Sequence, residues 1–245
     1  MNIRKTEEQL IASRREFLVR ALQLGAFAGG AGWNFPALAS WFGTIPGKLP
    51  EGKSVFELKG DVLVNGQPAN EGTIIKPSDK IQTGADSYLI AAVGANAFIV
   101  RDKSILDLGG AASAAKSVFR LVSGKFLGVF GKLGSNQQLA IHTPAATIGI
   151  RGTGVYAEAD PEKTYLCTCY GTTELAAGNE KAQVTSKHHD APKYILAQPE
   201  NGRKITPAPF INHTDLELMT LEALVGRKVP FGLPDSQYEA PRRDY

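Results

Sequence analysis

The chain has 245 residues, of which 43% are hydrophobic and 21% charged, so it has the composition of a globular protein and not of a disordered one. The formal net charge is +3, and the first 39 residues hold five basic and three acidic residues, which leaves 22 basic and 21 acidic residues in the remainder. This near-balance argues against nucleic acid or an anionic membrane as an electrostatic partner of the mature chain.

The N-terminal segment carries the features of an export signal. Arg14 and Arg15 lie in the sequence Ser-Arg-Arg-Glu-Phe-Leu, which resembles the twin-arginine export consensus. An apolar run rich in alanine and glycine follows, and then an Ala-x-Ala processing motif. We therefore expect residues 1–39 to be a signal peptide cleaved between Ala39 and Ser40, and the mature protein to be periplasmic. The apolar run is shorter than a good membrane span, so we expect a membrane anchor only if the signal stays uncleaved.

The middle of the chain is predicted to be all-β. Residues 40–54 contain two prolines among glycines and are interpreted as a linker. Over residues 55–200, short runs of β-favouring residues alternate with turn signals such as Asn65-Gly66, which favours a hairpin turn, and no helix-period segment of useful length interrupts them. Strands at this spacing indicate a sandwich, a barrel or a solenoid.

Two strands of period two, separated by a break, are predicted around residues 139–158. Proline fixes its own φ and disfavours helix at the residue before it, and the nearby glycines allow bends and close backbone approach. The arginine among these glycines has the geometry to bind carboxylates or carbonyls, but no nucleophile, acid–base pair or metal-binding pattern accompanies it. We interpret the motif as structural; its residues are Thr143, Pro144, Ala146, Arg151, Gly152 and Thr153.

The sequence Thr-Pro-Ala-Ala-Thr-Ile-Gly-Ile-Arg-Gly-Thr, residues 143–153, resembles the signature of FecR-type domains, extracytoplasmic β modules named after iron-transport signalling proteins. Asn65-Gly66, followed by Ile-Gln-Thr-Gly at 81–84, resembles the first half of such a domain. The resemblance covers about residues 60–197 and implies a solenoid-like stack of short strands. It also implies a binding or sensory module that contacts a periplasmic or envelope protein or another envelope ligand.

A cysteine–histidine group lies downstream of this motif. Cys167 and Cys169 are two apart on a predicted strand that ends at a turn at Gly171, so their side chains share a face. His188 and His189 follow in or beside a later turn. The cysteines are either small buried hydrophobes, or a strained disulfide, or two ligands of a zinc, copper or iron site completed by one or both histidines. The metal site leads to an alternative function, a periplasmic metal-binding or redox-active protein.

The C-terminal region, residues 201–245, is predicted to be a linker, one short helix and an extended tail. Thr214-Asp-Leu-Glu217 has the form of a capping box, and Gly226 ends the helix. Leu216, Met219, Ala223 and Leu224 share one face at helical spacing, and Leu218, Leu221 and Val225 widen it. The chain has no G-x-S-x-G or H-E-x-x-H motif and no convincing carboxylate pair, so we expect no enzymatic activity.

Overall fold

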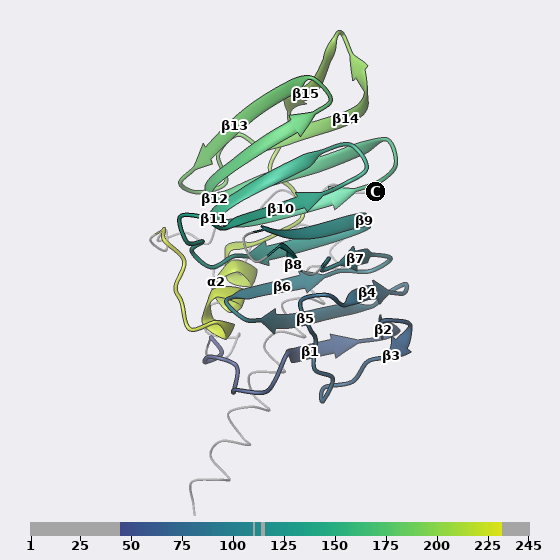
Figure 1. The fold of residues 1–245 in the computed structure, drawn as a ribbon, viewed down its shortest axis with the longest axis vertical. Helices are drawn as coiled ribbons and strands as arrows, with labels where there is room; N and C mark the ends of the chain where they lie inside the picture. The colour runs from purple at the N-terminus through teal and green to yellow at the C-terminus, as the bar shows by residue number, and fades with distance from the viewer. Residues whose placement is uncertain (1–44, 110, 114–115, 232–245) are drawn as a thin grey trace, which may run out of the picture.

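The computed structural model describes residues 45–109, 111–113 and 116–231, in which fifteen strands form one sheet and a single helix follows it (Figure 1). This confirms the predicted all-β class with one short C-terminal helix. The signal peptide predicted for residues 1–39, with Arg14, Arg15, Ala39 and Ser40, lies outside the described residues. No helix within the described ranges is both long and apolar enough to cross a membrane.

The strands are β1 (Val55–Lys59), β2 (Val62–Val64), β3 (Gln67–Pro68), β4 (Lys80–Thr83), β5 (Tyr88–Val93), β6 (Asn96–Val100), β7 (Ile105–Asp107), β8 (Ala111–Ser113), β9 (Lys116–Val129), β10 (Gln138–His142), β11 (Thr147–Ala159), β12 (Lys163–Ala177), β13 (Glu180–Ser186), β14 (Lys193–Glu200) and β15 (Arg203–Pro207), and the helix is α2 (Asp215–Leu224).

The pairings arrange these strands as two layers. One layer runs β3, β2, β4, β7, then the first half of β9, β10, the first half of β11, the second half of β12, and β13. The other runs β1, β5, β6, then the second halves of β9 and β11, the first half of β12, β14 and β15. The strands are stacked along the long axis of the molecule in approximate chain order (Figure 1). All the pairs are antiparallel except β9 with β10.

Three long strands run through both layers. They are the main difference from the expected solenoid-like stack of short strands. β9, β11 and β12 have 14, 13 and 15 residues. On one edge of each strand, the neighbouring strand changes at or beside a glycine with positive φ: Gly124 (93°), Gly152 (59°) and Gly171 (87°). A Cβ at Gly124 would lie 2.2 Å from Ser104 Oγ, so this bend needs glycine for space as well as for conformation. The glycines bend these strands without ending them.

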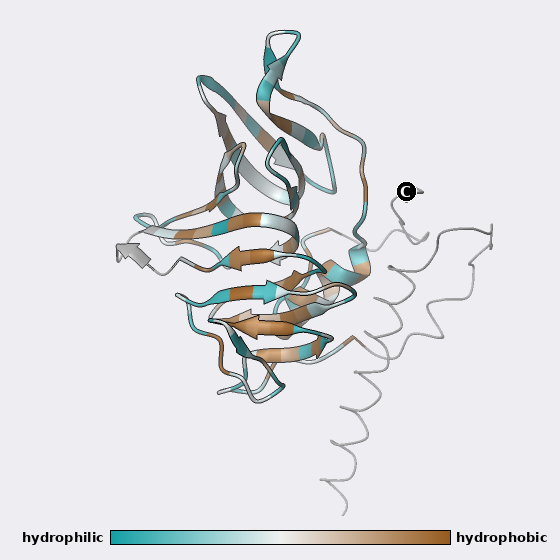
Figure 2. Cartoon of the chain, turned by 90° about the vertical axis from the view of Figure 1, so that its right-hand side faces the viewer, coloured by the Kyte–Doolittle hydropathy of each residue, from teal (hydrophilic) through white to brown (hydrophobic). Residues whose placement is uncertain are grey.

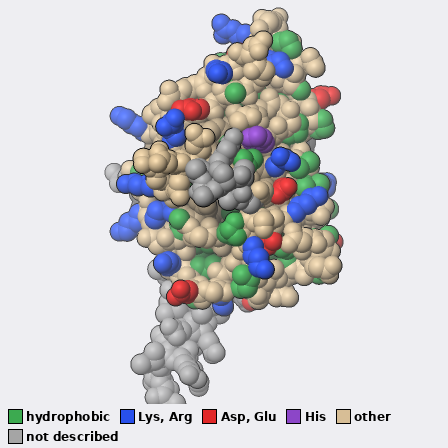
Figure 3. Space-filling view, viewed as in Figure 1, with side chains coloured by type: hydrophobic (Ala, Val, Ile, Leu, Met, Phe, Trp, Pro, Cys, Tyr) green, Lys and Arg blue, Asp and Glu red, His purple; other side chains and the backbone are tan. Residues whose placement is uncertain are grey.

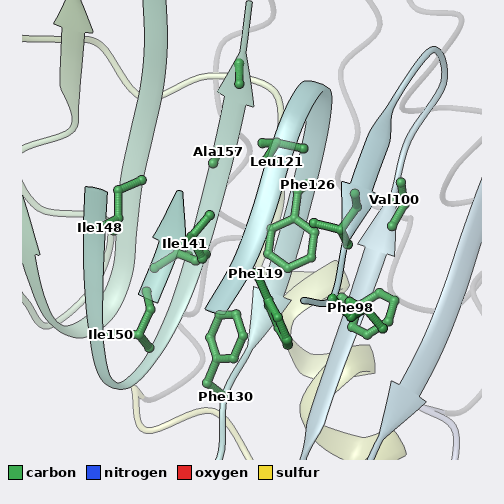
Figure 4. Packing of buried hydrophobic residues seen from close by; sticks show 14 of the residues in the cluster. Phe98, Val100, Phe119, Leu121, Phe126, Phe130, Ile141, Ile148, Ile150 and Ala157 are labelled. Carbon is green, nitrogen blue, oxygen red and sulfur yellow. The ribbon is translucent and has the colours of Figure 1, made fainter. Parts of the chain in front are cut away.

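The main hydrophobic core fills the space between the two layers. Phe98, Phe119, Phe126 and Phe130 lie together at its centre, with ring centroids 5.6–6.3 Å apart between neighbours (Figure 4). Isoleucines of β10 and β11 continue this core from the other side (Figure 4).

A second hydrophobic cluster covers the outer face of the layer that contains β5 and β6. Alternate residues of one strand serve the two cores: in β6, Phe98 belongs to the main core and Ile99 to the second. α2 lies on this outer face, to one side of the strands (Figure 2). Strands that are buried on both faces carry few exposed residues, so this layer is the best-protected part of the sheet.

α2 begins at the predicted capping box, in which the Thr214 side chain accepts from Glu217 N–H and the Glu217 side chain accepts from Thr214 N–H. The predicted apolar face is buried only in part. Leu218, Leu221 and Leu224 are at most 1% exposed, whereas Leu216, Met219 and Ala223 are only partly buried. The side of the helix that faces the sheet also contains polar residues. Glu217 binds Arg101 at 2.7 Å, and Glu222 accepts hydrogen bonds from Tyr170 and Arg227.

The sheet also extends beyond residue 200, where the β domain was expected to end. β15 pairs with β14, so residues 203–207 belong to the domain, and the linker is confined to the residues between β15 and α2. On the visible face, basic and acidic side chains are interspersed and form no single basic patch (Figure 3).

Candidate metal centre

β12 carries both cysteines on the face that α2 covers. The register places Cys167 opposite Tyr156 of β11, Tyr156 opposite Leu127 of β9, and Leu127 opposite Ile99 of β6. This row of side chains crosses the second cluster under the helix. Cys167 therefore points into a closed apolar layer and is 0% exposed.

A β-bulge lies at the second cysteine. Val155 pairs with Thr168 and Gly154 with Tyr170, so Cys169 is the extra residue on β12. Bulges commonly redirect a side chain next to a functional site. Here Cys169 and the following Tyr170 both belong to the second cluster, which a regular alternating strand would not allow. The bulge thus brings the ring of Tyr170 to the same side of the sheet as the two sulfurs.

The loop between β13 and β14 brings His189 to the cysteines. His189 has φ 56°, a left-handed conformation, and its N–H donates to Cys169 O at 2.8 Å. The Asp190 carboxylate accepts from Lys187 N–H at 2.9 Å, and the Ser186 hydroxyl accepts from Asp190 N–H at 2.8 Å. Non-glycine residues in this conformation persist where the surroundings hold them, and here the loop is fixed at both ends.

A third segment, between β15 and α2, supplies His213. The Tyr165 hydroxyl donates to Pro209 O at 3.0 Å and accepts from Ile211 N–H at 3.3 Å. Asn212, at φ 60°, donates through its side chain to Glu158 at 2.7 Å. These bonds hold the chain against β11 and β12 immediately before the helix, and His213 is only 2% exposed.

The donor atoms of Cys167, Cys169, His189 and His213 converge: all lie within 4.8 Å of one another. Cys167 Sγ is 3.5 Å from His189 Nδ1, Cys169 Sγ is 3.4 Å from His213 Nε2, and the two nitrogens are 3.1 Å apart. Tetrahedral zinc, with bonds of about 2.3 Å to sulfur and about 2.0 Å to nitrogen, has sulfur–nitrogen edges of about 3.5 Å and a nitrogen–nitrogen edge of about 3.3 Å. This buried group could therefore hold one metal ion.

Hydrogen bonds on the far side of each imidazole orient the two rings. His213 Nδ1 donates to Ile211 O at 2.7 Å, and His189 Nε2 donates to Asp215 Oδ1 at 2.8 Å. Because a carbonyl and a carboxylate can only accept, these bonds fix the tautomers and turn the lone pairs of His213 Nε2 and His189 Nδ1 toward the sulfurs. Outer partners of this kind accompany most metal-bound histidines.

Aromatic rings enclose the group. Tyr156 stacks on His213 with centroids 4.5 Å apart, and Phe210 lies 4.3 Å from His189 and 4.5 Å from His213. On the outer side, Phe231 lies 4.3 Å from the ring of His188. A shell of this composition keeps water away from the donor atoms and lowers the local dielectric.

In the metal-free group the pKa values of the two thiols shift in opposite directions. Burial opposes ionisation of Cys167, but hydrogen bonds with Cys169, His189 and His213 outweigh it and hold the pKa of this thiol well below its usual range. Burial, together with the neighbouring Cys167, raises the pKa of Cys169 well above its usual range. Burial also opposes protonation of His189, but bonds to Asp215 and Cys167 raise its pKa overall.

The carboxylate beside this group is held ionised. Burial favours the protonated form of Asp215, but hydrogen bonds from His189 and His188 outweigh it and lower the pKa of the carboxyl. His188 Nε2 lies 2.9 Å from both carboxylate oxygens, while its ring is more exposed than that of His189. His188 therefore belongs to the outer contacts of the group.

The structure brings together three of the four residues predicted from sequence, Cys167, Cys169 and His189. His188 contacts Asp215, with which it forms a second group that shares His189. The sequence prediction did not include His213, and its only local signal is its position directly before the capping box of α2. Both cysteines are free thiols, so the disulfide alternative is not the arrangement found.

The motif of residues 143–153 lies apart from this donor set. The Thr143 hydroxyl accepts from Ala146 N–H at 3.0 Å across the turn that contains Pro144. Arg151 is exposed and pairs with Glu174 at 2.9 Å. Gly152 and Thr153 lie where β11 shifts its register against β12, next to the bulge at Cys169.

No family model matches this sequence, and no curated protein matches it. Two crystal structures of a putative anti-sigma factor from Parabacteroides distasonis ATCC 8503, at 1.65 and 2.50 Å resolution, are similar to this fold. For each, the TM-score is 0.45 and the identity 9%, and the match covers 53% of this chain and 58% of that chain. The matched part therefore spans little more than half the length of the similar protein.

Proposed function

We propose that this chain is an exported, non-catalytic β module that binds one transition-metal ion through Cys167, Cys169, His189 and His213. The observation that carries this proposal is the set of donor distances: three edges of 3.1–3.5 Å match those of a tetrahedron around a single ion. Two thiolates and two imidazoles suit zinc, copper or iron better than magnesium or calcium, which prefer oxygen ligands.

Non-catalytic binding is supported by the same donor set. Catalytic metal sites keep a coordination position for water or substrate, whereas four protein ligands complete a tetrahedron. All four side chains are at most 6% exposed, and aromatic rings cover the histidines. Such a site stabilises a structure and leaves recognition to other surfaces.

The test is metal analysis of protein purified without chelators under reducing conditions. We expect about one metal ion per chain for the wild type, and loss of that ion in the double variant Cys167→Ser/Cys169→Ser. The matched control is His142→Ala, which removes a histidine of β10 outside the donor set. Wild-type protein that contains no metal under these conditions would contradict the proposal.

A second candidate function is that of a FecR-type binding or sensory module, which the motif at residues 143–153 favours. In this proposal the β domain contacts a periplasmic or envelope protein, or another envelope ligand, and the metal keeps the domain in one conformation. Affinity capture from a periplasmic extract, followed by metal analysis of the same sample, tests both functions together. A captured envelope protein supports the binding function; recovery of metal without any partner would count against it.

The proposed export follows from Arg14 and Arg15. The twin-arginine route carries folded proteins, so a metal ion could be loaded in the cytoplasm before export. Replacing both arginines by lysine should keep the protein in the cytoplasm, as measured by cell fractionation. Normal export of this double variant would remove the argument for periplasmic location.

A further inference from the structure

We infer that the ion is zinc and that it acts as a clasp, fastening the segment 208–231, which contains α2, onto the outer face of the sheet. This inference rests on the proposed metal binding. It adds the identity of the ion, the closed character of the site, and the part of the molecule whose order depends on it.

The first step is the origin of the ligands. Cys167 and Cys169 belong to β12, His189 to the loop between β13 and β14, and His213 to the segment that leads into α2. One ion would thus cross-link three parts of the chain that are separated by 20 residues or more. The His189 loop joins two strands of the sheet, whereas the segment with His213 follows the last strand.

The second step is the type of ion. A Rieske-type iron–sulfur cluster also uses two cysteines and two histidines, but it places them on different irons, so sulfur and nitrogen donors do not share one metal. Here each sulfur lies 3.4–3.5 Å from an imidazole nitrogen. Blue-copper sites use two histidines, one cysteine and a long axial methionine, whereas this set has two cysteines. Two thiolates and two imidazoles around one point are a structural zinc set.

The third step is what else holds the segment. α2 buries three leucines on the sheet and forms the ion pair between Glu217 and Arg101. It covers Ile99, Leu127 and Tyr156, which form part of an apolar face. These contacts, together with the hydrogen bonds of Pro209, Ile211 and Asn212 to β11 and β12, favour the docked position without metal, and the ion would add a cross-link at His213. The ion should therefore lower the frequency with which the segment opens. It should have a smaller effect on the position of the segment in the docked state.

The test is hydrogen exchange of the full exported chain, followed by mass spectrometry, with zinc present or removed by a chelator. If opening releases the ion, free zinc at 100 times its dissociation constant suppresses opening about 100-fold. We therefore expect amides of α2 to exchange about 100-fold faster after chelation, while those of β4 and β7 in the other layer do not change. In His213→Ala, α2 should exchange rapidly with or without zinc, and His142→Ala should behave as wild type.

The outcomes separate the two proposals. Absence of any bound metal would overturn the proposed function itself. Bound zinc whose removal leaves α2 exchange unchanged would overturn the clasp and leave metal binding intact. Equal acceleration in α2, β4 and β7 would show that these elements open only together, which contradicts a clasp that controls the opening of α2 separately. Copper or iron as the purified metal would overturn the zinc assignment.

Discussion

At the scale of single residues, His189 uses both of its ring nitrogens in the site. Its Nδ1 faces Cys167 and His213, while its Nε2 donates to Asp215, which is also the first residue of α2. The carboxylate therefore orients a ligand and favours its metal-binding tautomer. A negative side chain in the first turn also interacts favourably with the helix dipole, so Asp215 serves the helix and the histidine together.

Replacing Asp215 by asparagine should weaken zinc binding about 10–100-fold, because the imidazole of His189 loses its charged acceptor. The side-chain volume is nearly unchanged, so the circular dichroism spectrum should match the wild type. Competition with a chromogenic chelator measures the affinity. Glu174→Gln is the matched control, since it neutralises a carboxylate whose pair with Arg151 is exposed and thus of little energetic weight. Equal affinity of Asp215→Asn and wild type would show that the carboxylate does not support the ligand.

At the scale of elements, the bulge in β12 depends on the glycine-rich part of β11. A Cβ at Gly154 would lie 2.5 Å from the ring of Tyr170, so only glycine leaves room for this ring next to Cys169. The Tyr170 hydroxyl in turn donates to Glu222 of α2. The motif singled out from sequence as structural thus lies in direct contact with the strand that carries both cysteines.

Gly154→Ala should destabilise the protein by about 1–3 kcal/mol, the usual cost of overpacking a buried site. Urea unfolding, monitored by the tyrosine and tryptophan fluorescence, gives the free energy of unfolding. Gly149→Ala on the same strand is the control, because its Cβ would meet Glu174 Cβ at an ordinary 3.4 Å. Similar stability of the two variants would show that Tyr170 can move without cost.

At the same scale, glycine explains one difference between expectation and structure. The sequence predicted a strand that ends at Gly171, because glycine usually marks a turn. In the structure β12 continues to Ala177, since β11 pairs with it on both sides of the bend. A single sequence shows where the backbone is free to bend, but whether a strand continues depends on its partner strand.

At the scale of the whole molecule, local signals were sufficient for the strands, the capping box and the shared face of the two cysteines, since each depends on neighbouring residues. His189 followed from its nearness in sequence to this pair. His213 did not, because its approach depends on how the chain after β15 crosses back over the outer face of the sheet. The burial of the glutamates of α2 was not predicted for the same reason, since Arg101, which follows β6, and Tyr170 of β12 bind them from distant parts of the chain.

Because the proposed ion connects three parts of the chain in the folded state, the melting temperature of the protein should depend on the metal concentration. Zinc that binds only the folded state stabilises it by about 4 kcal/mol when free zinc is 1,000 times the dissociation constant. For a chain of this size, each 1 kcal/mol shifts Tm by about 2–4 °C, so we expect Tm to fall by about 8–16 °C when a chelator is added. Differential scanning calorimetry at several zinc concentrations measures the shift. The Tm of Cys167→Ser/Cys169→Ser should not depend on zinc, because two of the four donors are gone. A wild type with the same Tm at every zinc concentration would mean that no ion links these segments.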